Sequence, residues 1–222
     1  MQIVRLGGTA WLVRDDKQGI IVDASKAKSA KVINRRIKDL DIRIPLIFLT
    51  HTHYDHSGGM AALRAATGAK VMVGAAEADC LRSGYTPVPK GTHAIGRFLS
   101  GAAHTLTSKT CEHYVPVTQD VIPIDTRRTL EEFGFDADVL PLGAHTKGSI
   151  GLHIGDYFFA GDNVFGIGHV IYPPFADEPE QIRTAWEIIL NSRAKLICPG
   201  HGPMIKRDIL KKHYTSRFGK LL

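Results

Sequence analysis

The sequence contains only three cysteines, and their scarcity is its first informative feature. Cys80, Cys111 and Cys198 are widely spaced, are odd in number and form no CxxC pair. Neither a disulfide framework nor a zinc site built from thiolates is therefore expected. The chain also lacks an apolar run near the roughly 18 residues that a membrane span requires, and its first residues do not read as a signal peptide. These absences predict a protein of the reducing cytoplasm.

Composition places the chain among ordinary globular proteins. Its 222 residues are 44% hydrophobic and 23% charged, which predicts one domain spanning 1–222. There are 28 basic and 22 acidic side chains, giving a net charge of +6. Such a balance suits nucleic acids and anionic metabolites alike. Basic residues cluster at 26–38 and 206–220, and we interpret both clusters as amphipathic helices with solvated basic faces.

The pattern of apolar and turn residues predicts an α/β protein. Three short β-rich runs within the first 23 residues form a meander, and a helix follows at about 27–40, with Ser25 available as its cap. Pro45 then opens the buried strand 46–49. The second half repeats this style, with strands at 139–142, 149–154, 157–160 and 195–198 and a helix at 178–190. Two such halves predict two sheets back to back with helices outside.

The segment 86–120 is the hardest part of the chain to interpret. It contains three prolines, three histidines and only a weak helical pattern near 95–106. A loop of this length is usually either functional or mobile. Two interpretations stay open: a lid or insertion over the site, or a surface excursion without a role in chemistry.

The strongest feature of the sequence is a run of metal-capable side chains directly after the strand 46–49. Imidazole and carboxylate groups suit zinc, iron or manganese. His51 and His53 are two positions apart and can point to one side, whereas Asp55 and His56 belong to the next bend. One loop can thereby supply ligands to two metals. The two glycines that close the run let the backbone turn tightly before the next helix.

Three further candidates lie in similar positions later in the chain. His145, Asp162 and His201 each occupy a glycine-flanked turn just after a predicted buried strand. A lone histidine is usually a surface or core residue. Three independent coincidences of this kind are improbable for structural residues, and they predict additional metal ligands.

The motif His51-x-His53-x-Asp55-His56, followed by His145, Asp162 and His201, resembles the complete motif set of the metallo-β-lactamase superfamily, close to its glyoxalase II-like branch. The run 20–23 also resembles the family's early strand, which ends in a structural aspartate. The resemblance spans nearly the whole chain. It implies a four-layer αββα sandwich of two mixed β-sheets with helices on the outer faces.

The same resemblance implies a centre of two divalent metal ions, with zinc expected first and iron or manganese as alternatives. One metal would be held by His51, His53 and His145, the other by Asp55, His56 and His201, with Asp162 bridging both. Lys147 departs from the family pattern, which usually has proline at this position. We expect its side chain to point into solvent.

Such a centre predicts hydrolysis. Two cations lower the pKa of a shared water, so that hydroxide exists near neutral pH and attacks an acyl or phosphoryl centre. Asp55 is the candidate catalytic residue, because its second oxygen can carry a proton to the leaving group. Asp23 is a candidate acceptor for a ligand histidine, or simply a residue that closes a turn.

The expected function is therefore a cytoplasmic metal-dependent hydrolase of a small ester-like bond, a thioester or a lactone. β-Lactam hydrolysis is disfavoured by the missing export signal, and glyoxalase II proper by the short stretch after His201. The alternatives are a metal-dependent ribonuclease or phosphodiesterase, a persulfide dioxygenase with one iron, and a binding protein that has lost its metal. The positive charge predicts an anionic small substrate first and nucleic acid second. The sequence leaves the oligomeric state open.

Overall fold

The computed structural model describes residues 1–88, 91–92 and 112–221, which belong to two compact units. The first unit contains 1–88 and 112–124, and the second contains 91–92 and 125–221. Most of the predicted lid, 89–90 and 93–111, lies outside the described residues. Its role therefore stays a prediction, as does the single domain over 1–222.

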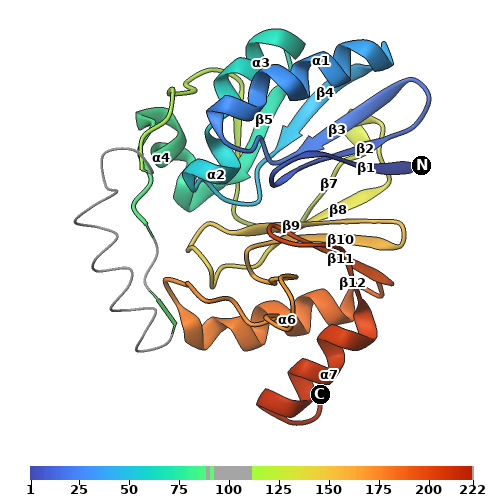
Figure 1. Cartoon of the computed structure of the whole chain (residues 1–222), viewed down its shortest axis with the longest axis vertical. Coiled ribbons are helices and arrows are strands. Elements are labelled where there is room, and N and C mark those ends of the chain that lie inside the picture. Colours follow the sequence, from blue (N-terminus) through green and yellow to red (C-terminus); the bar gives the residue numbers. More distant parts are fainter. Residues whose placement is uncertain (89–90, 93–111, 222) are drawn as a thin grey trace. The chain divides into compact units, whose positions relative to one another are not determined.

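The first unit is built on a mixed sheet with the strand order β1-β2-β3-β4-β5-β6 (Figure 1). The first three strands form the predicted antiparallel meander, and the pairs from β3 to β6 are parallel. The strands are β1 (Gln2–Gly7), β2 (Ala10–Arg14), β3 (Gln18–Val22), β4 (Arg43–Phe48), β5 (Lys70–Gly74) and β6 (Val121–Ile124).

Pro45 lies inside β4, although the sequence predicted it at the start of the strand. The pairing shifts between Gln18 opposite Arg43 and Ile20 opposite Leu46, so one residue of β3 faces two of β4. Proline has no N–H to donate, and a bulge of this kind lets a strand contain it without a broken ladder.

Helices cover one face of this sheet. The 3-10 turns are η1 (Ala27–Ser29) and η2 (Ala75–Glu77), and the α-helices are α1 (Ala30–Leu40), α2 (Tyr54–Ser57), α3 (Met60–Thr67) and α4 (Ala78–Ser83). α1 and α3 lie side by side over the strands (Figure 1). The helix predicted from residue 27 is confirmed, but Ser25 does not cap it. Lys26 occupies that position, and no side chain caps the turn.

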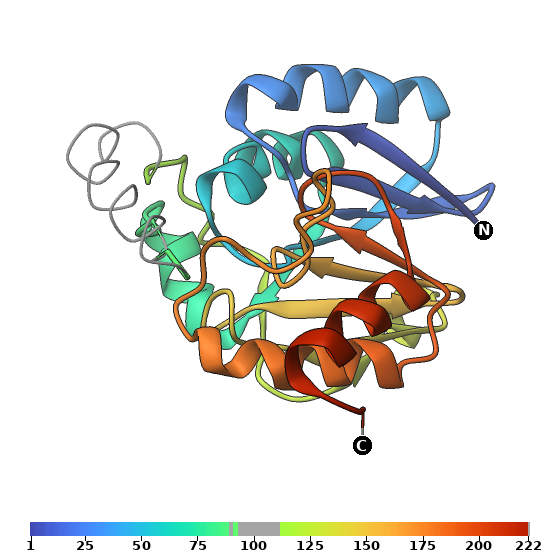
Figure 2. The ribbon, with the colours of Figure 1, turned by 60° about the horizontal axis from the view of Figure 1, so that its bottom comes forward.

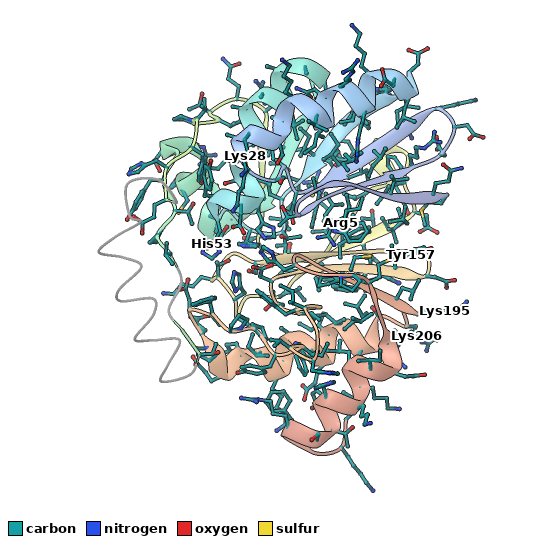
Figure 3. All side chains as sticks on the ribbon, in the orientation of Figure 1. Arg5, Lys28, His53, Tyr157, Lys195 and Lys206 are labelled. Carbon is teal, nitrogen blue, oxygen red and sulfur yellow. The ribbon has the colours of Figure 1, made fainter. Side chains whose placement is uncertain are left out.

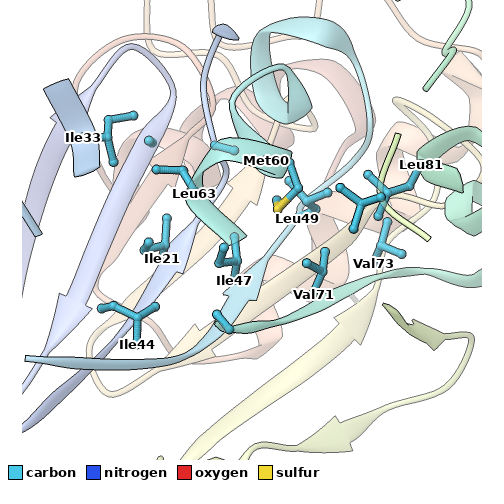
Figure 4. Close-up of a cluster of buried hydrophobic side chains, with 14 of the residues drawn as sticks. Ile21, Ile33, Ile44, Ile47, Leu49, Met60, Leu63, Val71, Val73 and Leu81 are labelled. Carbon is cyan, nitrogen blue, oxygen red and sulfur yellow. The ribbon is translucent and has the colours of Figure 1, made fainter. Parts of the chain in front are cut away.

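The core of the first unit lies between these helices and the sheet (Figure 4). Ile33 from α1 and Leu63 from α3 meet Ile21, Ile47 and Val71 from the strands, and all five side chains are fully buried. Burying a side chain of this size contributes about 1.5–3 kcal/mol. This packing holds the carboxyl end of β4 in place, where the candidate ligands begin.

The second unit contains another mixed sheet, in the order β12-β11-β10-β9-β8-β7. β10 and β11 are parallel, and the other pairs are antiparallel. The elements are β7 (Arg128–Thr129), η3 (Glu131–Phe133), β8 (Ala137–Pro141), β9 (Ile150–Ile154), β10 (Tyr157–Gly161), η4 (Pro179–Gln181), α6 (Ile182–Asn191), β11 (Leu196–Pro199), β12 (Ile205–Lys206) and α7 (Arg207–Phe218). The prediction of two mixed sheets with helices is confirmed.

Aromatic side chains form the core between this sheet and its helices. α6 and α7 pack against each other (Figure 2). Trp186 and Tyr214 are fully buried, with Phe218 edge-on to Trp186 at 5.9 Å between ring centroids. The guanidinium of Arg217 lies 3.6 Å from the ring centre of Tyr172. Cys198, in β11, is buried among apolar neighbours, as the sequence indicated. No helix within the described ranges has the length and apolar character needed to cross a membrane.

A hydrogen bond from Tyr214 to Glu187 predicts a pH dependence of stability. Burial, and then this bond to the carboxylate, raise the pKa of Tyr214, so the folded chain keeps the phenol proton to a higher pH than the unfolded chain. The contribution is complete below the unfolded value of about 10 and is lost as pH rises through the folded value. Melting temperatures measured above pH 9 should fall more steeply in the wild type than in Tyr214→Phe.

Tyr157→Phe is the matched control, because Tyr157 lies on β10 and takes no part in this bond. Its melting temperature should follow the wild-type curve. Identical slopes for all three proteins above pH 9 would contradict the assignment to Tyr214.

Candidate metal centre

The first set of predicted ligands occupies the loop that leaves β4 and the short helix α2. Figure 3 labels His53, the residue directly before α2. The Ser57 hydroxyl donates to the carbonyls of Thr52 and His53 at 2.8 and 3.1 Å, and the N–H of His56 donates to His53 at 2.8 Å. These hydrogen bonds hold residues 52–57 in a tight turn. The sequence HTHYDHS therefore folds into one compact ligand loop.

The loop brings its three imidazole rings together. The centroid of the His51 ring lies 4.7 Å from that of His53 and 4.0 Å from that of His56. His51 and His56 are fully buried and His53 is nearly so. Asp55 is half-buried, and its carbonyl accepts a hydrogen bond from the Thr9 hydroxyl at 2.6 Å. The first unit thus gathers four of the seven predicted ligands.

Asp23 orients two of these rings. Its Oδ2 accepts from Nδ1 of His56 at 2.7 Å, which is the predicted bond to one of the candidate ligand histidines. Thr50 Oγ1 lies 2.9 and 3.0 Å from the two carboxylate oxygens of Asp23, and 3.0 Å from Nδ1 of His51. Since the carboxylate only accepts, the Thr50 hydroxyl donates to it and accepts from His51.

These bonds fit the site to a metal. Protonated Nδ1 atoms on His51 and His56 leave each Nε2 as a lone pair, which is the form in which imidazole binds a divalent cation. A carboxylate or hydroxyl on the far nitrogen also raises the basicity of the ligand. Asp23 holds a left-handed backbone, with φ of 59°, and its N–H donates to Phe48 at 2.8 Å. The surroundings therefore fix an unfavourable conformation at the residue that orients the ligands.

The glycines after the ligand loop serve close packing. The sequence suggested that they let the backbone turn, but Gly58 and Gly59 both have ordinary helical dihedrals. A Cβ on Gly59 would lie 2.4 Å from the carbonyl oxygen of Ala24. Because glycine has no side chain, the backbone at Gly59 can lie against the segment after β3, where Asp23 lies.

A second buried carboxylate forms a hydrogen bond to the backbone of the ligand loop. Glu77 accepts from the N–H of Thr52, the residue between His51 and His53. The Thr52 hydroxyl accepts from Thr86 at 3.0 Å, and Thr86 lies 2.7 Å from the Tyr114 hydroxyl. Burial raises the pKa of Tyr114, so this phenol stays a neutral donor. The chain thus holds the backbone as well as the rings of the ligand loop.

Asp23→Asn is expected to weaken metal binding by about 10- to 100-fold, the usual cost of losing such a hydrogen-bond partner. The variant places an amide N–H₂ where Oδ2 accepts from His56, so two donors meet. Asparagine tolerates the left-handed backbone, and the fold should persist. Competition with a chromophoric chelator measures the affinity, and circular dichroism checks the fold.

Asp15→Asn makes the same chemical change at an exposed turn of the first unit, where Asp15 accepts from the N–H groups of Lys17 and Gln18. Its metal affinity should equal that of the wild type. Equal affinities for Asp23→Asn and Asp15→Asn would remove the role assigned to Asp23.

The second set of predicted ligands lies at strand ends of the second unit. His145 follows β8, and its Nδ1 donates to the carbonyl of Phe175 at 2.9 Å. A carbonyl only accepts, so Nε2 of His145 is again the lone pair. The N–H of His145 donates to Oδ1 of Asn163 at 3.2 Å, and Trp186 donates to the Asn163 carbonyl at 2.7 Å. α6 thereby anchors the turn that positions His145.

Asp162 is the centre of this second set. It follows β10, and its Oδ2 lies 3.8 Å from Nε2 of His145 and 3.4 Å from Nε2 of His201. The His201 ring stacks on Phe165 with a centroid distance of 5.3 Å. One carboxylate oxygen thus lies within 4 Å of each imidazole nitrogen, and imidazole and carboxylate are ligand types that suit a divalent cation.

Several roles were outside the reach of sequence reasoning. Thr50, Glu77 and Phe175 carried no local signal, because each contacts its partner only through the fold. The bond from His145 to Asn163 likewise joins residues of different turns. Lys147 is exposed, as expected.

Comparisons with known proteins agree with this geometry. The model of the metallo-beta-lactamase superfamily matches residues 3–201. The hydroxyacylglutathione hydrolase GloC of Haemophilus influenzae is 26% identical over 201 residues, covering 85% of this chain and 82% of the relative. A hydroxyacylglutathione hydrolase of Shewanella loihica is 28% identical over 160 residues, covering 71% of this chain and 48% of the relative. The chain spans about half the length, or less, of the first curated relatives it matches.

A solved structure shows the same fold. The BLEG-1 B3 metallo-beta-lactamase superposes with a TM-score of 0.73 at 21% identity, covering 98% of this chain and 99% of that one. The matched residues, 3–201, include the positions of all seven predicted ligands. The chain therefore belongs to the metallo-beta-lactamase superfamily.

Proposed function

We propose that the ligands of the two units together hold two divalent metal ions, and that the protein hydrolyses a small ester-like bond, a thioester or a lactone. The family match supports this proposal, because the matched residues, 3–201, include both ligand sets. The proposed ligands are His51, His53, Asp55, His56, His145, Asp162 and His201.

One observation carries the proposal further than family membership does. The Nδ1 atoms of His51, His56 and His145 are all bonded to groups that accept the ring proton. A histidine with a purely structural role can form its hydrogen bond through either Nδ1 or Nε2. Three rings with the same tautomer, each presenting Nε2, are typical of a metal-binding site.

Bound divalent metals would supply an activated hydroxide near neutral pH and an electrophile for the substrate carbonyl. The chain's own groups do the remaining work. Asp55 is half-buried and is the proposed carrier of a proton to the leaving group. Asp23 and Asn163 keep ligand residues oriented, so that reorganisation during the reaction is small.

The substrate class follows from the relatives and from charge. Two relatives are named hydroxyacylglutathione hydrolases, and a hydroxyacylglutathione is an anionic thioester. The net charge of +6 and the added metal charge favour an anionic small molecule. Zinc is the proposed metal, since histidine and carboxylate ligands suit it.

A panel of thioesters and lactones tests the proposal. The zinc-loaded protein should hydrolyse at least one class, and His145→Ala should lose that activity. His153→Ala is the control, because His153 lies on β9, where its ring meets the Gly155 carbonyl and stacks on Phe158, and it is not one of the proposed ligands. Inactivity on the whole panel with both metals bound would contradict the proposal.

Protein analysed as purified, before zinc is added, separates the alternatives. One iron per chain and oxygen consumption with a persulfide would indicate the dioxygenase. RNA cleavage with binding that weakens steeply as salt rises would indicate the nuclease. Either result would replace the thioester or lactone assignment.

A further inference from the structure

A second hollow lies in the first unit, at the opposite end of β4 from the ligand loop. It has a volume of about 770 Å³ and is lined by one side of α1 from Lys31 to Lys38, the residues that follow α1, the start of β4 and the end of α3. Sites for single small molecules commonly measure about 300–1,000 Å³. Its place at Arg43 and Ile44, before the strand that leads to His51, makes it a separate site from the proposed metal centre.

Cationic side chains surround this hollow. Lys31, Arg35 and Lys38 line it from α1 at helical spacing, and Arg43 lines it from β4. Asp41 is the only acidic residue of the lining, so the pocket has a net charge of +3. Within the part of the chain that the structure describes, none of the four cations forms an ion pair.

Other surface cations of this protein do find partners. Arg64 pairs with Asp120, and Arg183 pairs with Glu187. Helix dipoles account for only part of the cationic cluster: the carboxyl ends of α1 and α3 lie at the pocket, and each is equivalent to about half a negative charge. The remaining charge is still positive, so the hollow attracts anions.

The floor of the hollow is apolar. Ile37 and Ile44 are nearly fully buried there, and Ile42 is half-buried beside them. Asn34 adds a polar group: its Nδ2 donates to the Ala62 carbonyl at 3.3 Å, and its buried Oδ1 has no hydrogen-bond partner among the described residues.

We propose that this pocket binds a small phosphorylated molecule with an apolar ring, of the chemistry of a nucleoside diphosphate. The four cations fit the phosphates, and the isoleucine side chains fit a flat ring. The limited volume favours a single small molecule over a nucleic acid strand. The proposal does not depend on the hydrolase activity or on the metals.

Isothermal titration of the zinc-loaded full-length protein with ADP tests it. ADP should bind once per chain, and adenosine and pyrophosphate should each bind at least about tenfold more weakly, because each lacks one of the two recognised parts. Arg35→Glu should weaken ADP binding by about tenfold or more, the effect of losing a charge-assisted bond. Lys212→Glu makes the same charge change on the exposed face of α7 and should leave binding unchanged.

Two further variants locate the ligand. Ala66→Trp fills the hollow from an exposed position on α3 and should abolish ADP binding without disturbing the core. Asp162→Ala, in the proposed metal centre, should bind ADP normally, which keeps this site distinguishable from the hydrolase site. Absence of ADP binding, equal loss in Arg35→Glu and Lys212→Glu, or tighter binding of a short RNA that ADP does not displace would overturn the proposal.

Discussion

Asp162→Ala is expected to lower kcat/KM for the best thioester or lactone by at least about a thousandfold, the scale of several kcal/mol that a metal contributes to catalysis. The reason is its position. Oδ2 of Asp162 lies within 4 Å of the Nε2 atoms of both His145 and His201, so its loss leaves two imidazoles without the carboxylate between them. Steady-state kinetics at saturating zinc measures the effect.

Asp156→Asn is the control for this substitution. Asp156 is exposed on the turn between β9 and β10, and it pairs with Lys195 on the surface. Such pairs contribute about 0–1 kcal/mol, so activity and stability should stay close to wild type. Full activity of a folded Asp162→Ala protein would remove Asp162 from the site.

Asp55→Asn is expected to lower kcat by about 100- to 10,000-fold, the range of general acid-base catalysis, on a substrate with an alkoxide leaving group. Asparagine keeps an oxygen but cannot carry the proton. A thiolate leaves readily without protonation, so the loss on a thioester should be smaller. Comparing kcat on an ester and a thioester with the same acyl group separates proton transfer from metal binding.

Asp39→Asn, on the exposed surface of α1, serves as the control and should leave both rates unchanged. Equal losses on the ester and the thioester in Asp55→Asn would mean that Asp55 acts through metal binding alone. Metal content must be measured in the same samples, because loss of a metal ligand lowers the metal content and loss of a proton carrier does not.

The candidate site could be predicted from the sequence because several of the candidate ligands follow buried strands. The apolar runs before His51, His145 and His201 are β4, β8 and β11, and glycine follows closely after β8 and β11. A strand end followed by a polar turn is a local signal. Ligand order and spacing then identified the family.

The hydrogen bonds that orient the ligand loop could not be predicted from the sequence, because they join residues that are distant in sequence. Thr50 meets Asp23 across 27 positions, and Thr52 meets Glu77 across 25. Only the parallel pairing of β3, β4 and β5 brings these segments together. Pro45 was misplaced for a related reason, since its tolerance inside β4 depends on the register of β3.

The basic stretch 26–38 shows the same limit. Its helical spacing predicted α1 correctly, and its cations were interpreted as a solvated face. In the folded chain, three of these cations lie beside Arg43 and a group of isoleucine side chains. Part of the basic face of α1 therefore lines a pocket. Periodicity describes one helix and cannot report the hollow that two helices and a strand form together.

Elemental analysis of the purified chain tests the central claim most directly. After incubation with zinc and removal of free metal, we expect two zinc ions per chain, fewer in Asp162→Ala, and two in Asp156→Asn. Loss of zinc in His51→Ala as well as in His201→Ala would connect the ligand sets of both units to the same centre. A wild-type protein that retains no divalent metal, or variants that retain as much as the wild type, would contradict the proposed dinuclear centre.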